Sequence, residues 1–292
     1  MKKILVIGAK GMLGKDLVPV LRSSSESGSP LEWEVFGWDI DEIDIRVEKE
    51  TVERIENLKP QIVINVAAYT DVDGCESERE KAFAINAEGM RHVALGASRC
   101  GAKVVYLSTD YVFDGKKREP YLEDDPPAPL NVYGSSKLKG ELYVQELSRN
   151  GLIIRTQWLY GKHGKNFVFT LLRLAGEKDV LSIVDDQVGS PTYTMDLSRA
   201  ISNLIQKDAR GVFHVVNRNI CTWYDFSQAI LELSEFSGVK VLPISSDKLG
   251  RPAPRPSYSA LDTGKLMKET GMTLRPWKEA LKEFLSTLRK VG

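Results

Sequence analysis

Short runs rich in valine, isoleucine and leucine recur along the first half of the chain, and they constrain its fold more than any other feature. Helix-like stretches separate these runs. The segments expected to form strands are 4–7, 34–38, 62–66, 104–108 and 152–155. Apolar runs separated in this way are typical of parallel strands buried on both faces by helices. The first half is therefore predicted to be an α/β, doubly wound parallel sheet.

A glycine-rich turn, Gly8-Ala9-Lys10-Gly11-Met12-Leu13-Gly14, follows the first run directly. The next residues place Leu17, Val20 and Leu21 on one face of a predicted helix. Glycine allows a tight turn and a close approach to a pyrophosphate, whose charge lies at the helix N-terminus. The GxxGxxG spacing at the start of a βαβ pattern therefore predicts a Rossmann-type site for NADPH or NADH. A glycine turn without a ligand is the alternative.

Two residues give opposite indications about the cofactor. Asp39 ends the second predicted strand, where an acid accepts hydrogen bonds from the adenosine ribose of NAD. Lys10 precedes the second glycine, where its ammonium is placed to neutralise the 2′-phosphate of NADP. The simpler alternatives are a strand-end turn residue and a solvated lysine. Ala67 and Ala68, after the third strand, leave room for the nicotinamide ribose or for a tightly packed helix.

The regular alternation weakens beyond about residue 161. We expect an NAD(P)-binding domain over residues 1–160, to which segments near 187–217 return, and a smaller mixed region over 161–292 that mainly binds substrate. The proline-rich segment 252–256 is predicted to be an extended loop. Residues 277–288 carry the apolar spacing of an amphipathic closing helix.

Three residues indicate the chemistry. Tyr133 and Lys137 are four residues apart, which places them on one face of a helix. An ammonium near a phenol lowers the phenol's pKa, so that Tyr133 could act as an acid or base near neutral pH. Thr109, just after the fourth strand, is expected to hydrogen-bond the same carbonyl oxygen that Tyr133 protonates. The alternative for a lone YxxxK is an ordinary amphipathic helix.

Composition argues against several other roles. Lysine plus arginine and aspartate plus glutamate both total 40, so the formal net charge is zero and favours neither nucleic acid nor a membrane surface. The three scattered cysteines suggest a reducing compartment, and the first apolar run is too short for a secretion signal or a membrane span. We expect a soluble, cytoplasmic protein without a catalytic metal, and leave a homodimer open. The carboxylates of Asp16 and Asp196 remain candidates for a structural cation.

Further motifs carry a family resemblance. They are GAKGMLG (8–14), NVAAYTD (65–71), STDYVFDG (108–115), PLNVYGSSK (129–137), RTQWLYG (155–161), DQVGSPT (186–192) and RPSYSALD (255–262). Together they resemble the extended short-chain dehydrogenase/reductase family and, within it, the branch that reduces dTDP-linked 4-dehydrorhamnose. The first motif is generic to the superfamily, whereas the later ones are specific to this branch and extend over nearly the whole chain.

The resemblance implies that Thr109, Tyr133 and Lys137 form the catalytic triad. It also implies a substrate pocket lined by these first two residues together with Asp110, Tyr111 and Trp158, and an Arg255 that faces the substrate diphosphate or is only a solvated loop charge. Asn86 is implied to support the site from its helix. Taken together, the expected cofactor contacts are Gly8, Lys10, Gly11, Met12, Leu13, Gly14, Asp39, Ile45, Ala67, Ala68, Tyr69, Asn86, Tyr133 and Lys137.

The expected reaction is reduction of the C4 ketone of a dTDP-linked 4-keto-6-deoxy-L-hexose by NADPH or NADH. Related dehydratases carry an Asp-Glu pair after the threonine, whereas this chain has Asp110-Tyr111, which argues against elimination of water. An epimerase with retained NAD, another nucleotide-sugar reductase and a non-catalytic regulatory subunit with this fold remain alternatives.

Overall fold

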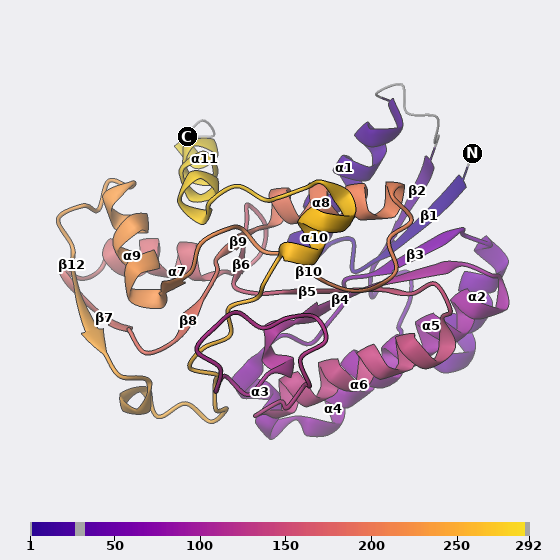
Figure 1. Ribbon diagram of the computed structural model, residues 1–292, viewed down its shortest axis with the longest axis horizontal. Coiled ribbons are helices and arrows are strands. Elements are labelled where there is room, and N and C mark those ends of the chain that lie inside the picture. The colour runs from indigo at the N-terminus through magenta and orange to yellow at the C-terminus, as the bar shows by residue number, and fades with distance from the viewer. Residues whose placement is uncertain (1, 27–32, 290–292) are drawn as a thin grey trace.

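The computed structural model describes residues 2–26 and 33–289, and a six-stranded parallel sheet forms its centre (Figure 1). The strands, in spatial order, are β2 (Trp33–Trp38), β1 (Lys2–Ile7), β3 (Ile62–Asn65), β4 (Lys103–Thr109), β5 (Leu152–Thr156) and β10 (Gly211–His214). Every neighbouring pair is parallel. The predicted doubly wound sheet and its first five strands are therefore confirmed. The chain reverses its winding direction between β1 and β3, which is where such sheets bind ligands.

Helices cover both faces of the sheet. One face carries α1 (Met12–Glu26) and α8 (Thr194–Gln206), and the other carries α2 (Glu48–Leu58), α5 (Gly89–Arg99) and α6 (Val132–Leu147). Leu17 and Ile201 are buried in the first layer, and Val93 and Val144 in the second. Each strand therefore contributes side chains to two apolar layers, which explains the nearly continuous apolar runs in the sequence.

The segment between β3 and α5 is one helical path with an irregular centre. It runs through α3 (Val72–Ser77) and α4 (Arg79–Phe83) to a π-helical turn, η1 (Ala84–Glu88), and then into α5. A π-turn carries one residue more than an α-turn, so it changes which side chains face the sheet. Nothing in the sequence predicted this turn, which contains Asn86.

A second apolar core lies among α7 (Phe167–Ala175), α9 (Trp223–Glu232) and α11 (Trp277–Arg289), on the left of Figure 1. The presence of α11 confirms the predicted closing helix. Three short strand pairs complete this region: β6 (Leu159–Tyr160) with β9 (Thr192–Tyr193), β7 (Val180–Val184) with β12 (Lys240–Ile244), and β8 (Val188–Gly189) with β11 (Cys221–Thr222). The helix α10 (Gly264–Thr270) and the short turns η2 (Asp110–Val112) and η3 (Ser246–Leu249) lie in the connections.

The chain crosses between the two cores more than once. After leaving β5 for the second core, it returns through α8, which packs against α1, and through β10, which pairs with β5. The proline-rich segment 252–256 has no regular secondary structure, as predicted. The last strand of the central sheet, β10, therefore comes later in the sequence than α7 of the second core.

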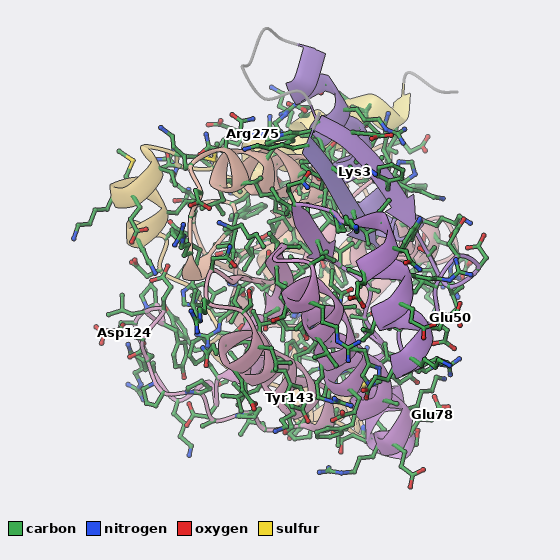
Figure 2. The ribbon with its side chains drawn as sticks, turned by 90° about the vertical axis from the view of Figure 1, so that its right-hand side faces the viewer. Lys3, Glu50, Glu78, Asp124, Tyr143 and Arg275 are labelled. Atoms are coloured by element: carbon green, nitrogen blue, oxygen red, sulfur yellow. The ribbon has the colours of Figure 1, made fainter. Side chains whose placement is uncertain are left out.

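The carboxyl ends of the parallel strands all lie at one edge of the sheet. In Figure 2, Lys3, near the amino end of β1, lies in the upper part of the view, and Glu78, beyond the carboxyl end of β3, lies in the lower part.

The three cysteines are free thiols, and Cys75 and Cys221 are buried. Within residues 2–26 and 33–289, no helix has the length and apolar character needed to cross a membrane.

Candidate active site

The turn between β1 and α1 requires glycine at two of its three glycine positions. Gly8 has a φ of +88°, and a Cβ there would lie 2.6 Å from the backbone nitrogen of Ala67. A Cβ on Gly14 would lie 2.2 Å from the Gly8 carbonyl oxygen, whereas one on the exposed Gly11 would lie 3.2 Å from it. The first N–H groups of α1 have no acceptor within the helix. This turn can therefore bind a pyrophosphate closely.

A cavity of about 310 Å³ adjoins the turn where β1, β2 and β3 end. Most of its wall is aliphatic, with a few charged groups, which suits a flat base and its ribose. The lining residues are Ile7, Gly8, Asp39, Ile40, Ile43, Asp44, Ile45, Arg46, Ala67, Ala68 and Ile85. This close-packed turn and the cavity beside it fit the adenosine diphosphate half of a nicotinamide dinucleotide. Five of the expected cofactor residues line this cavity: Gly8, Asp39, Ile45, Ala67 and Ala68.

The Asp39 side chain contacts the backbone of Lys10. One carboxylate oxygen of Asp39 accepts a hydrogen bond from the Lys10 N–H at 2.8 Å, and the other accepts one from the Ile40 N–H at 2.9 Å. The Lys10 ammonium binds the carboxylate of Asp41 and lies 3.2 Å from that of Glu42. The Lys10 side chain is 54% exposed, so the alternative of a solvated loop lysine stays open beside these contacts with two acids.

Other predicted cofactor residues use their side chains elsewhere. Leu13 is buried in the apolar layer between α1 and the sheet. The Asn166 amide lies 3.9 Å from the Met12 sulfur, and the Tyr69 hydroxyl donates to Glu78. Leu13 therefore has only backbone groups to offer a cofactor, and the expected contacts of Met12 and Tyr69 remain predictions.

Asn86 connects the loop after β3 with the helix that carries Tyr133. Its side-chain oxygen accepts a hydrogen bond from the Tyr69 N–H at 2.8 Å. Its amide donates to the Tyr69 carbonyl and to the Ser136 hydroxyl, both at 3.0 Å. Both amide protons are used in this way, so the structure favours Asn86 as a support for the site. The expected cofactor contact of Asn86 remains a prediction.

Thr109 and Tyr133 come together at the carboxyl end of β4. Both are buried, and the Thr109 side chain is near enough to Tyr133 to lower the pKa of the phenol in part. The close approach depends on Gly134, where a Cβ would lie 2.1 Å from the Tyr111 carbonyl oxygen. Asn131 fixes the start of α6 by accepting the Gly134 N–H at 2.8 Å. The predicted helix with Tyr133 and Lys137 on one face is therefore present.

The pKa of Tyr133 is raised in this arrangement, whereas the sequence predicted a lowered one. Burial raises the pKa of Tyr133, and the nearby Thr109 side chain offsets this only in part. The Lys137 ammonium donates to the Leu107 carbonyl at 2.7 Å and lies 4.1 Å from the centre of the Tyr106 ring. Burial lowers the pKa of Lys137 to about 7. The expected net lowering of the Tyr133 pKa is therefore wrong for this arrangement, because desolvation outweighs the influences that lower it.

Asp110 is a buried acid beside this pair. One of its oxygens accepts a hydrogen bond from the Thr109 hydroxyl at 3.1 Å. The other oxygen is buried and has no hydrogen-bond partner in the part of the chain that the structure describes, although the nearby Ser259 side chain helps to lower the pKa of this acid. Burial raises the pKa of Asp110 to about 7. A buried acceptor without a partner is costly, so this oxygen is suited to a ligand hydroxyl.

Tyr111 and Arg255 extend the site toward the proline-rich segment. The Tyr111 ring packs edge-to-face against Tyr133 with centroids 5.5 Å apart, and the nearby Arg255 charge partly offsets the rise in the Tyr111 pKa that burial causes. The Arg255 guanidinium binds both oxygens of Asp73, at 3.0 and 2.9 Å. The alternative of a solvated loop charge for Arg255 is therefore wrong. Its expected contact with a diphosphate remains a prediction, and Asp73 would compete for the same donors.

Trp158 belongs to an aromatic stack that the sequence did not predict. Its ring lies parallel to that of Trp223 with centroids 3.7 Å apart, and Phe167 packs against Trp223. The backbone of Trp158 is left-handed, with a φ of +49°. A Cβ on Gly189 would lie 2.8 Å from the Trp158 ring, so glycine makes room for the indole. The stack thus holds Trp158 in an unusual backbone conformation.

The two candidate cation ligands have protein partners. Asp16 accepts a hydrogen bond from Thr194 at 2.5 Å, and Asp196 binds the Arg275 guanidinium at 2.8 and 2.9 Å. Within the described residues, no group of three or more His, Cys, Asp or Glu side chains is arranged to hold a metal ion. The Asp16 carboxylate therefore accepts a hydrogen bond from the protein, and the Asp196 carboxylate neutralises an arginine of the protein.

Sequence reasoning missed several residues around the site. The cavity wall includes Ile40, Ile43, Asp44 and Arg46, all from the segment after β2. This segment alternates isoleucine with charged residues, a signal that could have indicated one apolar and one charged side. Nothing in the sequence indicated the pairing of Asp73 with Arg255, because these residues are far apart along the chain.

Comparisons with known proteins show which proteins this chain is similar to. The family model described as RmlD substrate binding domain matches residues 1–290. The spore coat polysaccharide biosynthesis protein SpsK of Bacillus subtilis is 41% identical, over 98% of this chain and 97% of its own. A solved dTDP-4-dehydrorhamnose reductase of Clostridium acetobutylicum has a TM-score of 0.92 and 40% identity, over 98% and 99% of the two chains. The Bacillus anthracis dTDP-4-dehydrorhamnose reductase, solved in complex with NADP, has a TM-score of 0.90 and 39% identity, over 98% and 99%.

Proposed function

The chain belongs to the RmlD substrate binding domain family, and from this membership we propose that it reduces a dTDP-linked 4-keto sugar with a nicotinamide cofactor. The substrate is dTDP-4-dehydro-L-rhamnose and the product dTDP-L-rhamnose, a donor for cell-surface polysaccharides. The observation that carries the proposal is the buried hydroxyl pair of Thr109 and Tyr133, which lies beside the unpartnered oxygen of Asp110.

The glycine turn and the cavity hold the cofactor in this proposal. Gly8 and Gly14 allow the pyrophosphate to approach α1, and Asp39 accepts hydrogen bonds from the adenosine ribose. The bound cofactor supplies a hydride for the ketone carbon. Asn86 positions the loop after β3 against α6, so that the cofactor side and the chemical side of the site keep a fixed spacing.

Tyr133 donates the proton in the proposed reaction. The phenol hydrogen moves to the C4 carbonyl oxygen as that oxygen gains charge, and the electrons of the O–H bond remain on Tyr133. Burial raises the pKa of Tyr133, which keeps the phenol protonated until the substrate needs the proton. Thr109 hydrogen-bonds the same oxygen and holds it in line.

Lys137 compensates the charge that remains on Tyr133. A buried phenolate is costly, and a buried ammonium one helical turn away reduces that cost. Since the pKa of Lys137 is lowered to about 7, the fraction of Lys137 in the ammonium form decreases as the pH rises above neutrality. Turnover should therefore decline on the alkaline side of neutral pH.

The sugar pocket of the proposal is formed by Asp110, Tyr111 and Trp158. The free oxygen of Asp110 accepts a sugar hydroxyl, and the Trp158 ring, held by Trp223, offers a flat apolar surface. Arg255 binds the diphosphate after exchanging its pair with Asp73. Two independent supports for this pocket are the buried orphan acceptor and the left-handed backbone of Trp158.

We further propose that residues 1–160, together with segments near 187–217, bind the cofactor, and that the rest of 161–292 mainly binds the sugar nucleotide. The pairing of β10 with β5 supports the return of the chain to the first unit. A cytoplasmic location and a homodimer stay predictions, and sedimentation of the purified protein would test the latter.

The decisive experiment supplies dTDP-4-keto-L-rhamnose, made in place from dTDP-glucose by a dehydratase and an epimerase, and follows loss of nicotinamide absorbance. We expect the reduced cofactor to be oxidised only when dTDP-glucose, the dehydratase and the epimerase are all present. A parallel reaction without the epimerase leaves the 4-keto-6-deoxy-D-glucose isomer and tests the sugar configuration. Absence of oxidation with either sugar and with both NADH and NADPH would contradict the proposal.

A further inference from the structure

The wall of the cofactor cavity next to β2 is strongly acidic. Residues 39–46 contain four acids, Asp39, Asp41, Glu42 and Asp44, and one base, Arg46. Asp39, Asp44 and Arg46 line the cavity itself. Even when Lys10 is added to this group, acids exceed bases by two. This charge balance matters because the two nicotinamide cofactors differ by one phosphate on the adenosine ribose.

Both bases in this group already have partners. The Lys10 ammonium binds Asp41 and Glu42, and the hydrogen bond with Asp41 raises the pKa of Lys10. Arg46 binds both oxygens of Asp44, with contacts at 2.9, 3.1 and 2.7 Å. A ribose phosphate would therefore have to break one of these pairs before it gained a counter-ion.

Asp39 is fixed where the ribose hydroxyls would bind. Its two oxygens accept the backbone N–H groups of Lys10 and Ile40, and its own N–H donates to Glu42 at 2.8 Å. The carboxylate is thus held at the cavity wall and has remaining acceptor capacity for hydroxyl donors. A phosphate at the same position carries a charge of about −1.5 to −2 and offers mainly acceptors. Two anions would then face each other, while Lys10 and Arg46 are already paired with acids.

We propose that this chain selects NADH over NADPH, with Asp39 as the discriminating residue and with Asp41 and Glu42 withholding Lys10 from a 2′-phosphate. The inference rests on the proposed nicotinamide-dependent reduction and assigns its electron donor. The fold alone does not decide the choice, since the Bacillus anthracis relative is a complex with NADP. Selection comes from the charges of the segment after β2.

Equilibrium binding tests the proposal without turnover. Titration of the purified protein with NADH and NADPH, followed by nucleotide fluorescence, should give a Kd for NADH at least about tenfold lower. Competition by AMP and adenosine 2′,5′-bisphosphate should show the same order, because the difference lies at the ribose. Higher salt should narrow the ratio, since screening weakens repulsion between exposed charges.

Two variants separate the contributions. Asp39→Asn keeps the size of the side chain and should weaken NADH binding while strengthening NADPH binding. The double variant Asp41→Asn/Glu42→Gln should free Lys10 and strengthen NADPH binding severalfold, with little change for NADH. The double variant Glu50→Gln/Glu53→Gln on α2 removes the same charge away from the cavity lining and should leave the NADPH to NADH ratio unchanged.

The outcomes divide clearly. The proposal is supported if wild type has a lower Kd for NADH than for NADPH and if this preference is smaller or reversed in the Asp39 variant and in the Asp41/Glu42 double variant. Equal or tighter binding of NADPH, or an equal response of the α2 control, overturns it while leaving the reductase proposal intact. Failure of both dinucleotides to bind would overturn the reductase proposal, and with it the assignment of the donor.

Discussion

The cofactor end and the chemical end of the site lie at the same edge of the sheet but are built differently. Around the cofactor cavity, charged groups are exposed and occur in pairs, such as Lys10 with Asp41. Around Tyr133, the polar groups are buried, and burial is the largest influence on the pKa values of Asp110 and Lys137. The first region controls its ligand through backbone shape and neighbouring charges, and the second controls chemistry through desolvation.

This difference explains the direction of the pKa shifts. At the cofactor end, hydrogen bonding to Lys10 lowers the pKa of Asp41. At the chemical end, burial raises the pKa of Asp110 to about 7, although both residues are aspartates. Desolvation disfavours a charge, whereas an opposite charge favours it. The same residue type is therefore an anion in one region and close to half-protonated at neutral pH in the other.

The largest expected effect is at the chemical end. Tyr133→Phe removes the proton donor but keeps the ring, so turnover should fall about 10²–10⁴-fold. The Kd of the nicotinamide cofactor, measured by fluorescence titration, should change little because the glycine turn and the cavity are intact. Turnover near the wild-type value would show that Tyr133 is not the donor.

A stability measurement compares the two aspartates. The folded pKa of Asp110 is above its ordinary value of 3.8, so the unfolded chain releases this proton first and wild-type stability falls as the pH rises from 3.8 to about 7. Asp110→Asn removes this loss, so its free energy of unfolding relative to wild type should rise by roughly 4 kcal/mol across that interval.

Asp41→Asn is the matched control for this measurement. Since the pKa of Asp41 is lowered, its contribution to stability is present above pH 3.8 and is lost as the pH falls further. The free energy of unfolding of Asp41→Asn, relative to wild type, should therefore change with pH in the opposite direction from that of Asp110→Asn and by a smaller amount. Denaturant unfolding at a series of pH values measures both variants. Parallel curves for the two variants would contradict the contrast between the regions.

The smallest effect concerns the backbone of the cofactor end. In Gly14→Ala, the new Cβ would lie 2.2 Å from the Gly8 carbonyl oxygen, so the turn must shift. We expect a loss of about 1–3 kcal/mol in unfolding free energy together with weaker dinucleotide binding. Gly11→Ala, with 3.2 Å to the same oxygen, is the control and should change both less. Equal effects at the two positions would contradict the role assigned to Gly14.

Local patterns were sufficient to predict much of this molecule. Gly8 and Gly14 follow from the needs of a tight turn, and the spacing of Tyr133 and Lys137 follows from the period of a helix. The strands of the sheet were visible because both faces are buried. These features depend on neighbours within a few residues, which a sequence displays directly.

Features that depend on distant contacts were not predictable. The pKa of Tyr133 is raised rather than lowered, because α6 packs against β4 and buries the phenol. The pairing of Asp73 with Arg255 joins a short helix to a proline-rich loop. The π-turn that contains Asn86 has no sequence signature. Each of these depends on how elements pack in three dimensions, so the chemical end was less completely predicted than its residues suggest.

The return of the chain through α8 and β10 has a consequence for engineering. A truncation after residue 160 would remove the strand that pairs with β5 and the helix that covers α1. The backbone of β5 would then form an open sheet edge, which is prone to pairing with other chains and to aggregation. To exchange the sugar-binding part with that of a relative, a designer must therefore replace segments on both sides of α8 and β10 and retain these two elements in the recipient.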